Sequence, residues 1–190
     1  MSFFRSKGLI LFMFLFVGNT VVYGYDKSHL AKLKFDGSCI KCDLTGADLR
    51  KAKLANANLS GANLRGSILI LADLRGANLN GANLTEVNLS AANMSGLISV
   101  ATNYRGANLS GANLQKANLE RSSFLNALIM NADLTGVNIK NVNLFGANLS
   151  GTKLQGLDLS LAKLCKTKVP SKGWKSFFIS SQTNNNNCKK

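Results

Sequence analysis

The sequence predicts a solenoid, a chain wound into stacked coils, and three observations predict it. Large hydrophobic residues recur every five positions from Leu44 to Leu164, and Ser99 is the only polar residue among these 25 positions. The residue two places earlier is Ala in 15 of the 25 units. The residue one place earlier is Asn or Asp in 18 of them, and the phase holds from the first unit to the last.

A period of five fits neither regular secondary structure. A helix advances about 100° per residue and would scatter these leucines around its circumference, whereas a strand would send them to alternate faces. The backbone must therefore turn once per unit, so that stacked coils bury the large and small inward side chains in one column. Asn, Ser and Gly at the other positions suit tight turns. The period alone leaves open how many units make one coil.

The repeated unit also resembles a known family. The string Ala-Asn-Leu-Ser-Gly-Ala-Asn-Leu, at 57–64 and again at 107–114, resembles the A(N/D)LXX pattern of pentapeptide-repeat proteins. This resemblance implies an all-β fold, a right-handed quadrilateral β-helix with four pentapeptides per coil. The 25 units then make about six coils and a rod of roughly 30 Å at the spacing of strands in a sheet. Segments 39–49 and 164–170 resemble the Cys-x-x-Cys-Asp-Leu opening and the closing segment of exported members.

The expected domains are a signal peptide at 1–24, an N-terminal cap at 25–38, the solenoid at 39–166 and a C-terminal capping tail at 167–190. Arg5 and Lys7 precede an apolar run at 9–17, and the compact residues 22–24 precede a cleavage that leaves Tyr25 first. An uncleaved anchor is the alternative, but the run is well short of the ~20 residues that span a bilayer. We expect an exported protein, periplasmic or secreted, with no transmembrane segment after cleavage.

Both ends of the solenoid need covers, because a terminal coil exposes unpaired backbone groups. Between Asp26 and Gly37, residues 28–34 have a candidate N-cap, apolar residues at three-residue spacing and a terminating glycine, which predicts a short capping helix. At the other end Pro170 breaks the repeat. The apolar residues that follow as a candidate cover are Trp174, Phe177, Phe178 and Ile179.

The four cysteines favour disulfides in an exported chain. Cys39 and Cys42 lie at one end of the rod and Cys165 and Cys188 at the other, which excludes one four-cysteine zinc site within a chain. We expect Cys39 and Cys42 at inward sites of the first coil, bonded or free. We expect Cys165 to bond Cys188 and tie the tail to the last coil. No metal or cofactor is expected.

The groups needed for catalysis are sparse, and we predict no enzyme. His29 is the only histidine and is expected to be solvated on the capping helix. No phosphate-binding loop or nucleophile elbow appears, and six Asn-x-Ser/Thr triplets follow from the repeat itself. Five of the acids likewise occupy the Asn/Asp position of the unit: Asp43, Asp48, Asp73, Asp133 and Asp158.

The charge is concentrated at the C-terminal end. The chain carries +14, and residues 153–190 contribute +7 because only Asp158 opposes their lysines. Such a cluster favours contact with an anionic envelope surface, and a solvated basic tail is the alternative. Lysine prevails over arginine without interleaved aromatic residues, so we expect no nucleic-acid partner. The candidate contacts are Lys163, Lys166, Lys168, Lys172 and Lys175.

Three lapses in the repeat occur at 30-residue spacing, where Ile68, Ile98 and Leu128 replace Asn or Asp. With four units per coil, the first and third fall on one wall, three coils apart, and Ile98 falls on the opposite wall with Val100. Exposed apolar groups mark partner surfaces, although drift in a tolerant repeat is the alternative. The candidate partner surface is Ile68, Ile70, Leu71, Leu128 and Met130.

Three functional hypotheses follow. The leading one is an exported, non-enzymatic scaffold whose walls bind a protein partner or pack with copies of themselves. The second is a secreted effector or thiol-active factor that uses Cys39 and Cys42. The third is DNA mimicry that inhibits a topoisomerase, which the quinolone-resistance members of the family suggest. DNA mimicry needs an acidic surface and a cytoplasmic location, so the charge of +14 and the signal segment argue against it.

Overall fold

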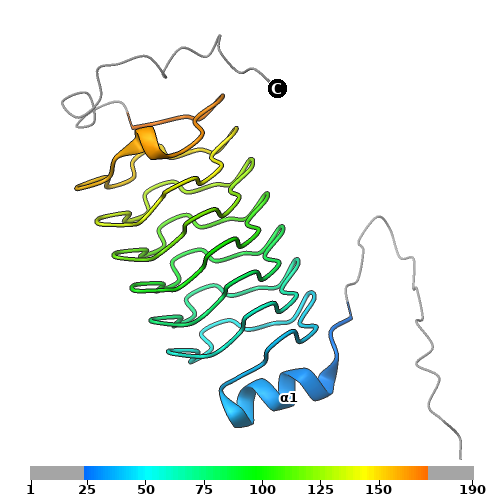
Figure 1. Cartoon of the computed structure of the whole chain (residues 1–190). Coiled ribbons are helices and arrows are strands. Elements are labelled where there is room, and N and C mark those ends of the chain that lie inside the picture. Colours follow the sequence, from blue (N-terminus) through cyan, green and yellow to red (C-terminus); the bar gives the residue numbers. More distant parts are fainter. Residues whose placement is uncertain (1–23, 171–190) are drawn as a thin grey trace, which may run out of the picture.

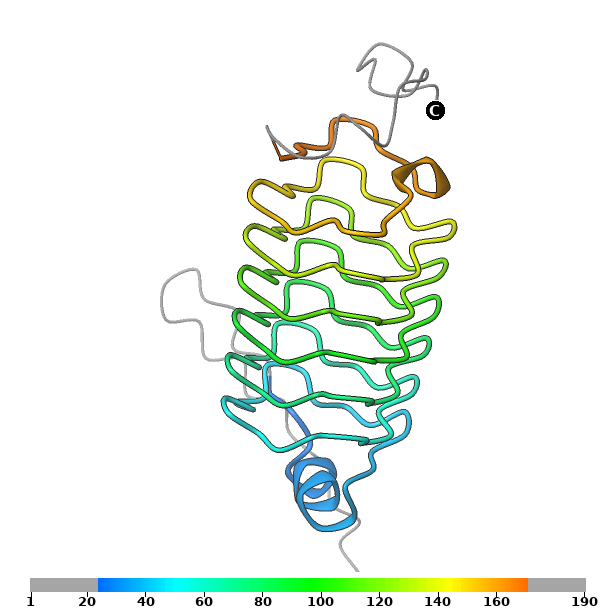
Figure 2. The same cartoon turned by 90° about the vertical axis from the view of Figure 1, so that its left-hand side faces the viewer.

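Residues 24–170 are described by a computed structural model, in which stacked coils form a rod with helix α1 at its N-terminal end (Figures 1 and 2). Within this range no helix is long and apolar enough to cross a bilayer. Almost all of the predicted signal peptide and most of the predicted C-terminal cap, residues 174–179 included, lie outside the described residues.

The β-bridges fix the register of the coils. In residues 24–170 every bridge is parallel and joins residues 20 positions apart, as between Asp43 and Asn63 or between Asn63 and Asn83. Since the unit is five residues long, one coil holds four units, as the family resemblance implied. The bridges form four series, one on each wall of the rod. Each is a bridge of single residues and not a longer strand, because the chain turns again within five residues.

The corners explain why Gly and Asn recur in the sequence. The residue two places after each inward large side chain has a positive φ at every unit from Lys41 to Lys166, with Leu161 as the exception. Gly adopts this conformation freely and Asn tolerates it, as at Gly111 (φ 70) and Asn131 (φ 57). The N–H of the next small inward residue then donates a hydrogen bond to the carbonyl of the preceding large inward residue, and this bond closes the turn.

Within residues 24–170, the positive φ of the corners is lost at one unit. Residues Leu159–Leu161 form the short 3-10 helix η1, and the Asp158 side chain caps it by accepting a hydrogen bond from the Ser160 N–H. The ladder resumes at the bridge between Asn143 and Lys163 and ends at Lys168. The sequence keeps its phase through this segment, so the period predicted a regular corner at Leu161 where the backbone forms a helical turn.

Ser99 is the polar residue among the 25 large inward positions, and a neighbouring side chain compensates for it. Ser99 is fully buried, and its hydroxyl lies 2.7 Å from the hydroxyl of Tyr104. The Tyr104 ring stacks on Phe124 with 4.5 Å between centroids and 10° between planes. Burial raises the pKa of Tyr104, and the bond to Ser99 offsets this only in part, so the phenol is neutral. The small residue thus leaves room for a ring where other coils pair two leucines.

The outward Asn and Asp residues close local turns. Their side-chain oxygen accepts a hydrogen bond from the N–H two residues later, as from Ser60 to Asn58 at 3.2 Å. At Asn88 the side-chain oxygen also accepts a hydrogen bond from the Ser90 hydroxyl, at 2.7 Å. The Asn-x-Ser/Thr triplets and the regularly spaced acids are therefore structural features of the repeat, in agreement with the sequence interpretation.

Asp133 is the repeat acid that accepts hydrogen bonds from the most different residues, three in all. Its carboxylate accepts from the Thr135 N–H at 3.0 Å and the Gln115 amide at 2.9 Å, and Lys153 Nζ lies 3.5 Å away. Desolvation raises the pKa of Asp133, but the bonds from Thr135 and Gln115 and the Lys153 charge outweigh it and lower the pKa to about 2. The charged form is therefore stabilised by the fold.

Replacing Asp133 by Asn is expected to reduce the acid sensitivity of the protein. Because the folded pKa lies below the ordinary value of 3.8, this carboxylate stabilises the fold above about pH 4, and the contribution is lost as the pH falls toward about 2. Asn keeps the turn-closing oxygen, so Asp133→Asn should lower the free energy of unfolding at neutral pH by only about 1 kcal/mol. It should flatten the decline below pH 4, measured by urea unfolding across pH. A slope equal to the native slope would contradict the prediction.

Candidate functional surfaces

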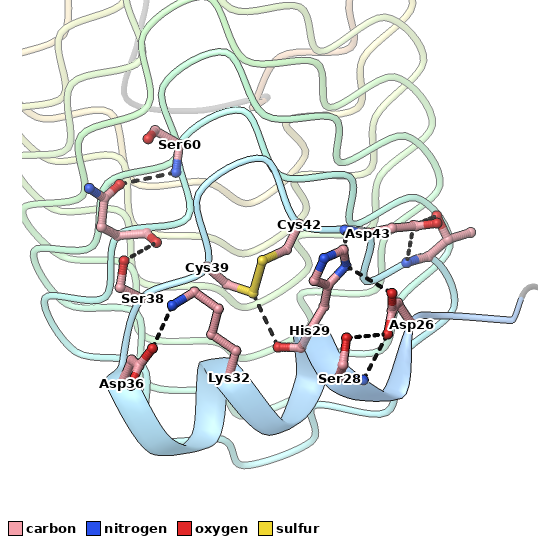
Figure 3. The surroundings of a disulfide bond; sticks show 12 residues. Asp26, Ser28, His29, Lys32, Asp36, Ser38, Cys39, Cys42, Asp43 and Ser60 are labelled. Carbon is pink, nitrogen blue, oxygen red and sulfur yellow. Dashed lines mark hydrogen bonds and ion pairs between the residues drawn. A yellow bond between two sulfur atoms is a disulfide. The ribbon is translucent and has the colours of Figure 1, made fainter. Parts of the chain in front are cut away.

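Helix α1 (Lys27–Asp36) confirms the predicted capping helix. Asp26 is its N-cap and accepts from the Ser28 N–H at 2.7 Å, while Gly37 ends it with a positive φ of 63 (Figure 3). Leu33 is the buried residue of the helix. The helix therefore attaches to the first coil through the buried Leu33 and the partly buried Leu30, together with polar contacts.

Two of these polar contacts replace a missing coil. In the body of the rod, an outward residue donates its N–H to the coil below, as Asn63 donates to the Cys42 carbonyl at 2.8 Å. No coil lies below Asp43, and its N–H instead donates to His29 Nδ1 at 3.0 Å. The Asp26 N–H in turn donates to the Asp43 carbonyl at 3.4 Å. The lone histidine, expected to be simply solvated, thus caps the backbone of the first coil.

The two N-terminal cysteines, left open as bonded or free, form a disulfide with an S–S distance of 2.06 Å. Cys39 is fully buried and Cys42 is 3% exposed. Cys39 Sγ lies 3.1 Å from the His29 carbonyl oxygen, so α1 covers the bond (Figure 3). A reductant reaches these sulfurs only after the helix moves away.

The C-terminal cysteines were predicted to bond each other. Cys165 is part of a disulfide, which agrees with its expected oxidised state. Its expected partner Cys188 lies outside the described residues, so the pairing stays a prediction.

The bridges place the repeat lapses as the four-unit coil predicted. Ile68 and Leu128 belong to one series, through Asn88 and Asn108, and Ile98 belongs to another series. Leu71 and Leu128 are exposed, whereas Ile68, Ile70 and Met130 are half-buried. These five candidate residues therefore lie on one wall and its bordering corner.

The sequence analysis missed two outward residues, Leu125 and Phe145. They follow inward residues on adjacent coils, where the Asn126 N–H donates to the Phe145 carbonyl at 2.9 Å. Lys166 Nζ lies 5.7 Å from the centroid of the Phe145 ring. The signal was available, because the same position in the four preceding coils, from 45 to 105, holds Thr or Arg.

The basic residues surround the C-terminal end of the rod. Lys153, Lys163 and Lys168 occupy bridge positions in three different series, and all three are exposed. Lys166, also exposed, occupies a corner. Lys172 and Lys175 lie outside the described residues. The positive charge therefore favours contact with a surface at the end of the rod over contact with a partner along one wall.

Within residues 24–170, the core contains a small cavity. It has a volume of about 10 Å³, room for about one water molecule, and is lined entirely by apolar side chains, among them Leu119, Phe124 and Leu144. Across residues 24–170, no three metal-ligating side chains gather in one place.

Comparison with known proteins gives a family match. The family model for pentapeptide repeats matches 8 copies, over residues 42–81, 67–97, 107–144 and 143–169. Comparison with curated protein sequences finds no match.

Several solved structures are similar to the chain. A pentapeptide repeat protein, Rfr23, from the cyanobacterium Cyanothece 51142 is 28% identical over 75% of this chain and 97% of that chain, with a TM-score of 0.35. HetL from Nostoc sp. strain PCC 7120, involved in heterocyst differentiation regulation, is 27% identical over 67% and 78%, with a TM-score of 0.25. QnrB1, a plasmid-mediated fluoroquinolone resistance protein, is 15% identical over 73% and 84%, with a TM-score of 0.32.

Proposed function

Because the chain belongs to the pentapeptide-repeat family, we propose that it is an exported, non-enzymatic scaffold that binds a partner through the outer surface of a rigid rod. The rod has the right-handed quadrilateral form of about six coils that the family implies. The observation that carries the proposal is the closed Cys39–Cys42 disulfide beneath α1. Disulfides persist in oxidising compartments, which supports the periplasmic or secreted location that the signal segment predicts.

The use of polar groups supports binding over catalysis. His29 accepts a hydrogen bond from the first coil through Nδ1. The repeat acids accept turn-closing hydrogen bonds, as Asp48 does from Arg50 and Asp158 does from Ser160. The residues most often used as acids, bases and nucleophiles thus have structural roles, while the walls are continuous surfaces that suit contact with a macromolecule.

The two other hypotheses have less support. A thiol-active factor needs an accessible sulfur, and Cys39 and Cys42 are buried and bonded to each other. A DNA mimic needs an acidic surface, and the chain carries +14. We propose a protein partner along the rod and, at the lysine-rich end, an anionic envelope surface.

The location and the redox state are tested by intact mass, with and without reduction and alkylation, on protein recovered from the native extracytoplasmic fraction. The expected mass is that of residues 25–190 with two disulfides, alkylated only after reduction. Full-length protein with free thiols would overturn the export proposal.

Contact with an anionic surface is tested separately by sedimentation with vesicles. Phosphatidylglycerol vesicles should retain the protein and phosphatidylcholine vesicles should not. The double variant Lys163→Glu and Lys168→Glu should lose this retention, whereas Lys116→Glu, at a corner in the middle of the rod, should keep it. Equal retention of the two variants would contradict a role for the C-terminal end.

A further inference from the structure

On one wall, apolar residues occupy positions at which the usual Asn or Asp would accept a hydrogen bond from the backbone. In most units the outward Asn or Asp accepts the N–H two residues later, but Ile68 and Leu128 have no oxygen to do so. Among the described residues, the N–H groups of Ile70 and Met130 donate no hydrogen bond. The same holds for Ala55, Leu125 and Gln155, where Lys53, Ser123 and Lys153 replace the Asn or Asp, so the wall of Ile68 differs in that its replacements are apolar. An unpaired backbone donor lowers stability unless water or a partner satisfies it. These two apolar residues therefore weaken the isolated coil.

The third lapse differs from the other two. At Ile98 another residue of the chain supplies the missing acceptor, because the Val100 N–H donates to the Asn80 side-chain oxygen at 2.7 Å. The wall of Ile68 also carries a strained corner, since Leu71 has a φ of 59 and is 54% exposed. Leu71 is the only large apolar residue with positive φ in the described range, and this conformation costs roughly 1 kcal/mol. Unrepaired and strained apolar groups thus gather on one wall.

We infer that the wall carrying Ile68 and Leu128 is the interface of an antiparallel homodimer. The bridge series runs through Ile68, Asn88, Asn108 and Leu128, and its centre lies midway between the two asparagines. Consider a two-fold axis that lies in the plane of the wall, crosses the rod and passes through this centre. Rotation about it places Ile68 of each copy against Leu128 of the other. An interface of this kind uses the same patch on both copies.

The borders of the wall match under the same operation. On one border, Ile70 faces Met130 of the second copy and Leu71 faces Asn131. Between them, Ala91 and Gly111 occupy corresponding corners, and such short side chains allow the two backbones to approach.

On the other border, Glu86 of one copy comes beside Arg105 of the second. Glu86 also lies 3.5 Å from Arg65 of its own chain, so a charged cluster would bridge the copies. A parallel arrangement exchanges the two borders and sets Arg65 against Leu71 and Glu86 against Ala91, which leaves charges opposite small or apolar groups. The antiparallel arrangement also sets Arg65 opposite Leu125, but it alone brings the opposite charges of Glu86 and Arg105 together, and this pair favours it.

The interface is small. The paired section covers four coils, about 14 Å from Ile68 to Leu128 at the strand spacing, whereas stable complexes bury roughly 800 Å² per partner. We expect a reversible dimer with a Kd in the micromolar range or weaker, on the order of 10 µM to 1 mM. This inference goes beyond the proposed function and holds whether or not the lysine-rich end contacts an anionic surface.

Sedimentation equilibrium of the oxidised protein across this concentration range provides the test. The wild type should show a monomer–dimer equilibrium. The double variant Ile68→Asn and Leu128→Asn should weaken the dimer at least ~10-fold. These replacements restore the repeat residue and its turn-closing oxygen, so the monomer should be at least as stable as before. The matched control Ile98→Asn, on the opposite wall, should dimerise like the wild type.

Charge exchange tests the antiparallel register. Glu86→Arg alone should weaken the dimer several-fold, and adding Arg105→Glu should restore it, because the two positions meet across the two-fold axis. A monomer at every concentration would overturn the inference. So would a dimer unaffected by the asparagine variants, which would indicate association through the ends of the rod, or a charge-exchange pair with no recovery.

Discussion

Ser99→Leu combined with Tyr104→Leu is expected to restore most of the stability that each replacement removes alone. Ser99→Leu places a larger side chain against the Tyr104 ring and deprives its buried hydroxyl of the partner 2.7 Å away. Overpacking and an unpaired hydroxyl together should cost about 2–5 kcal/mol. Tyr104→Leu leaves a void and an unpaired Ser99 hydroxyl and should cost about 2–4 kcal/mol. The double variant carries leucine at both positions, as most other units do, and should unfold within about 1 kcal/mol of the wild type.

Urea unfolding of the four proteins forms a double-mutant cycle, and we expect a coupling free energy of at least about 2 kcal/mol. As a control, Tyr104→Leu combined with Leu54→Ala should be additive, because Leu54 lies on the opposite wall and 50 residues earlier in a register of 20 residues per coil. Additive losses for Ser99 and Tyr104 would contradict the compensation between them. They would mean that Ser99 is a defect that the core tolerates independently of the ring.

The fold was predictable from the sequence to the extent that its determinants are local. The inward Leu and Ala columns and the glycine-rich corners all lie within one five-residue unit, so the period reveals them. The number of units per coil is not local, because a period of five permits any number. That number came from the family resemblance, and the bridges between residues 20 apart show it directly.

The features that escaped prediction are contacts that exist only after the coil closes. Tyr104 reaches Ser99 across a corner, and His29 meets Asp43 because a helix lies where a coil is missing. Neither pair has a signature in the period. Leu125 and Phe145 were missed for another reason. Both occupy the outward position that follows each large inward residue, and the predicted partner surface was based on the Asn/Asp position instead. The walls were therefore placed correctly while part of their apolar surface was missed.

The N-terminal cap leads to the second large effect. Leu33→Asp is expected to detach α1 from the first coil, because Leu33 is 2% exposed and a carboxylate there would be buried without a partner. Loss of the helix would break the bonds that His29 and Asp26 make to Asp43 and expose an unpaired backbone edge. Such an edge promotes association, so we expect end-to-end aggregation. We also expect the free energy of unfolding of the first coil to fall by roughly 3 kcal/mol.

Two readouts locate the damage, and the same helix supplies a control. Hydrogen exchange at the Asp43 amide should accelerate, and the Cys39–Cys42 disulfide should become reducible under conditions that leave the wild type oxidised. Phe35→Asp changes a side chain that is 92% exposed two residues further along α1, so its exchange and reduction should match the wild type. If Leu33→Asp left the disulfide protected, the helix would not be its cover, and the conclusion that α1 shields Cys39 and Cys42 would be wrong.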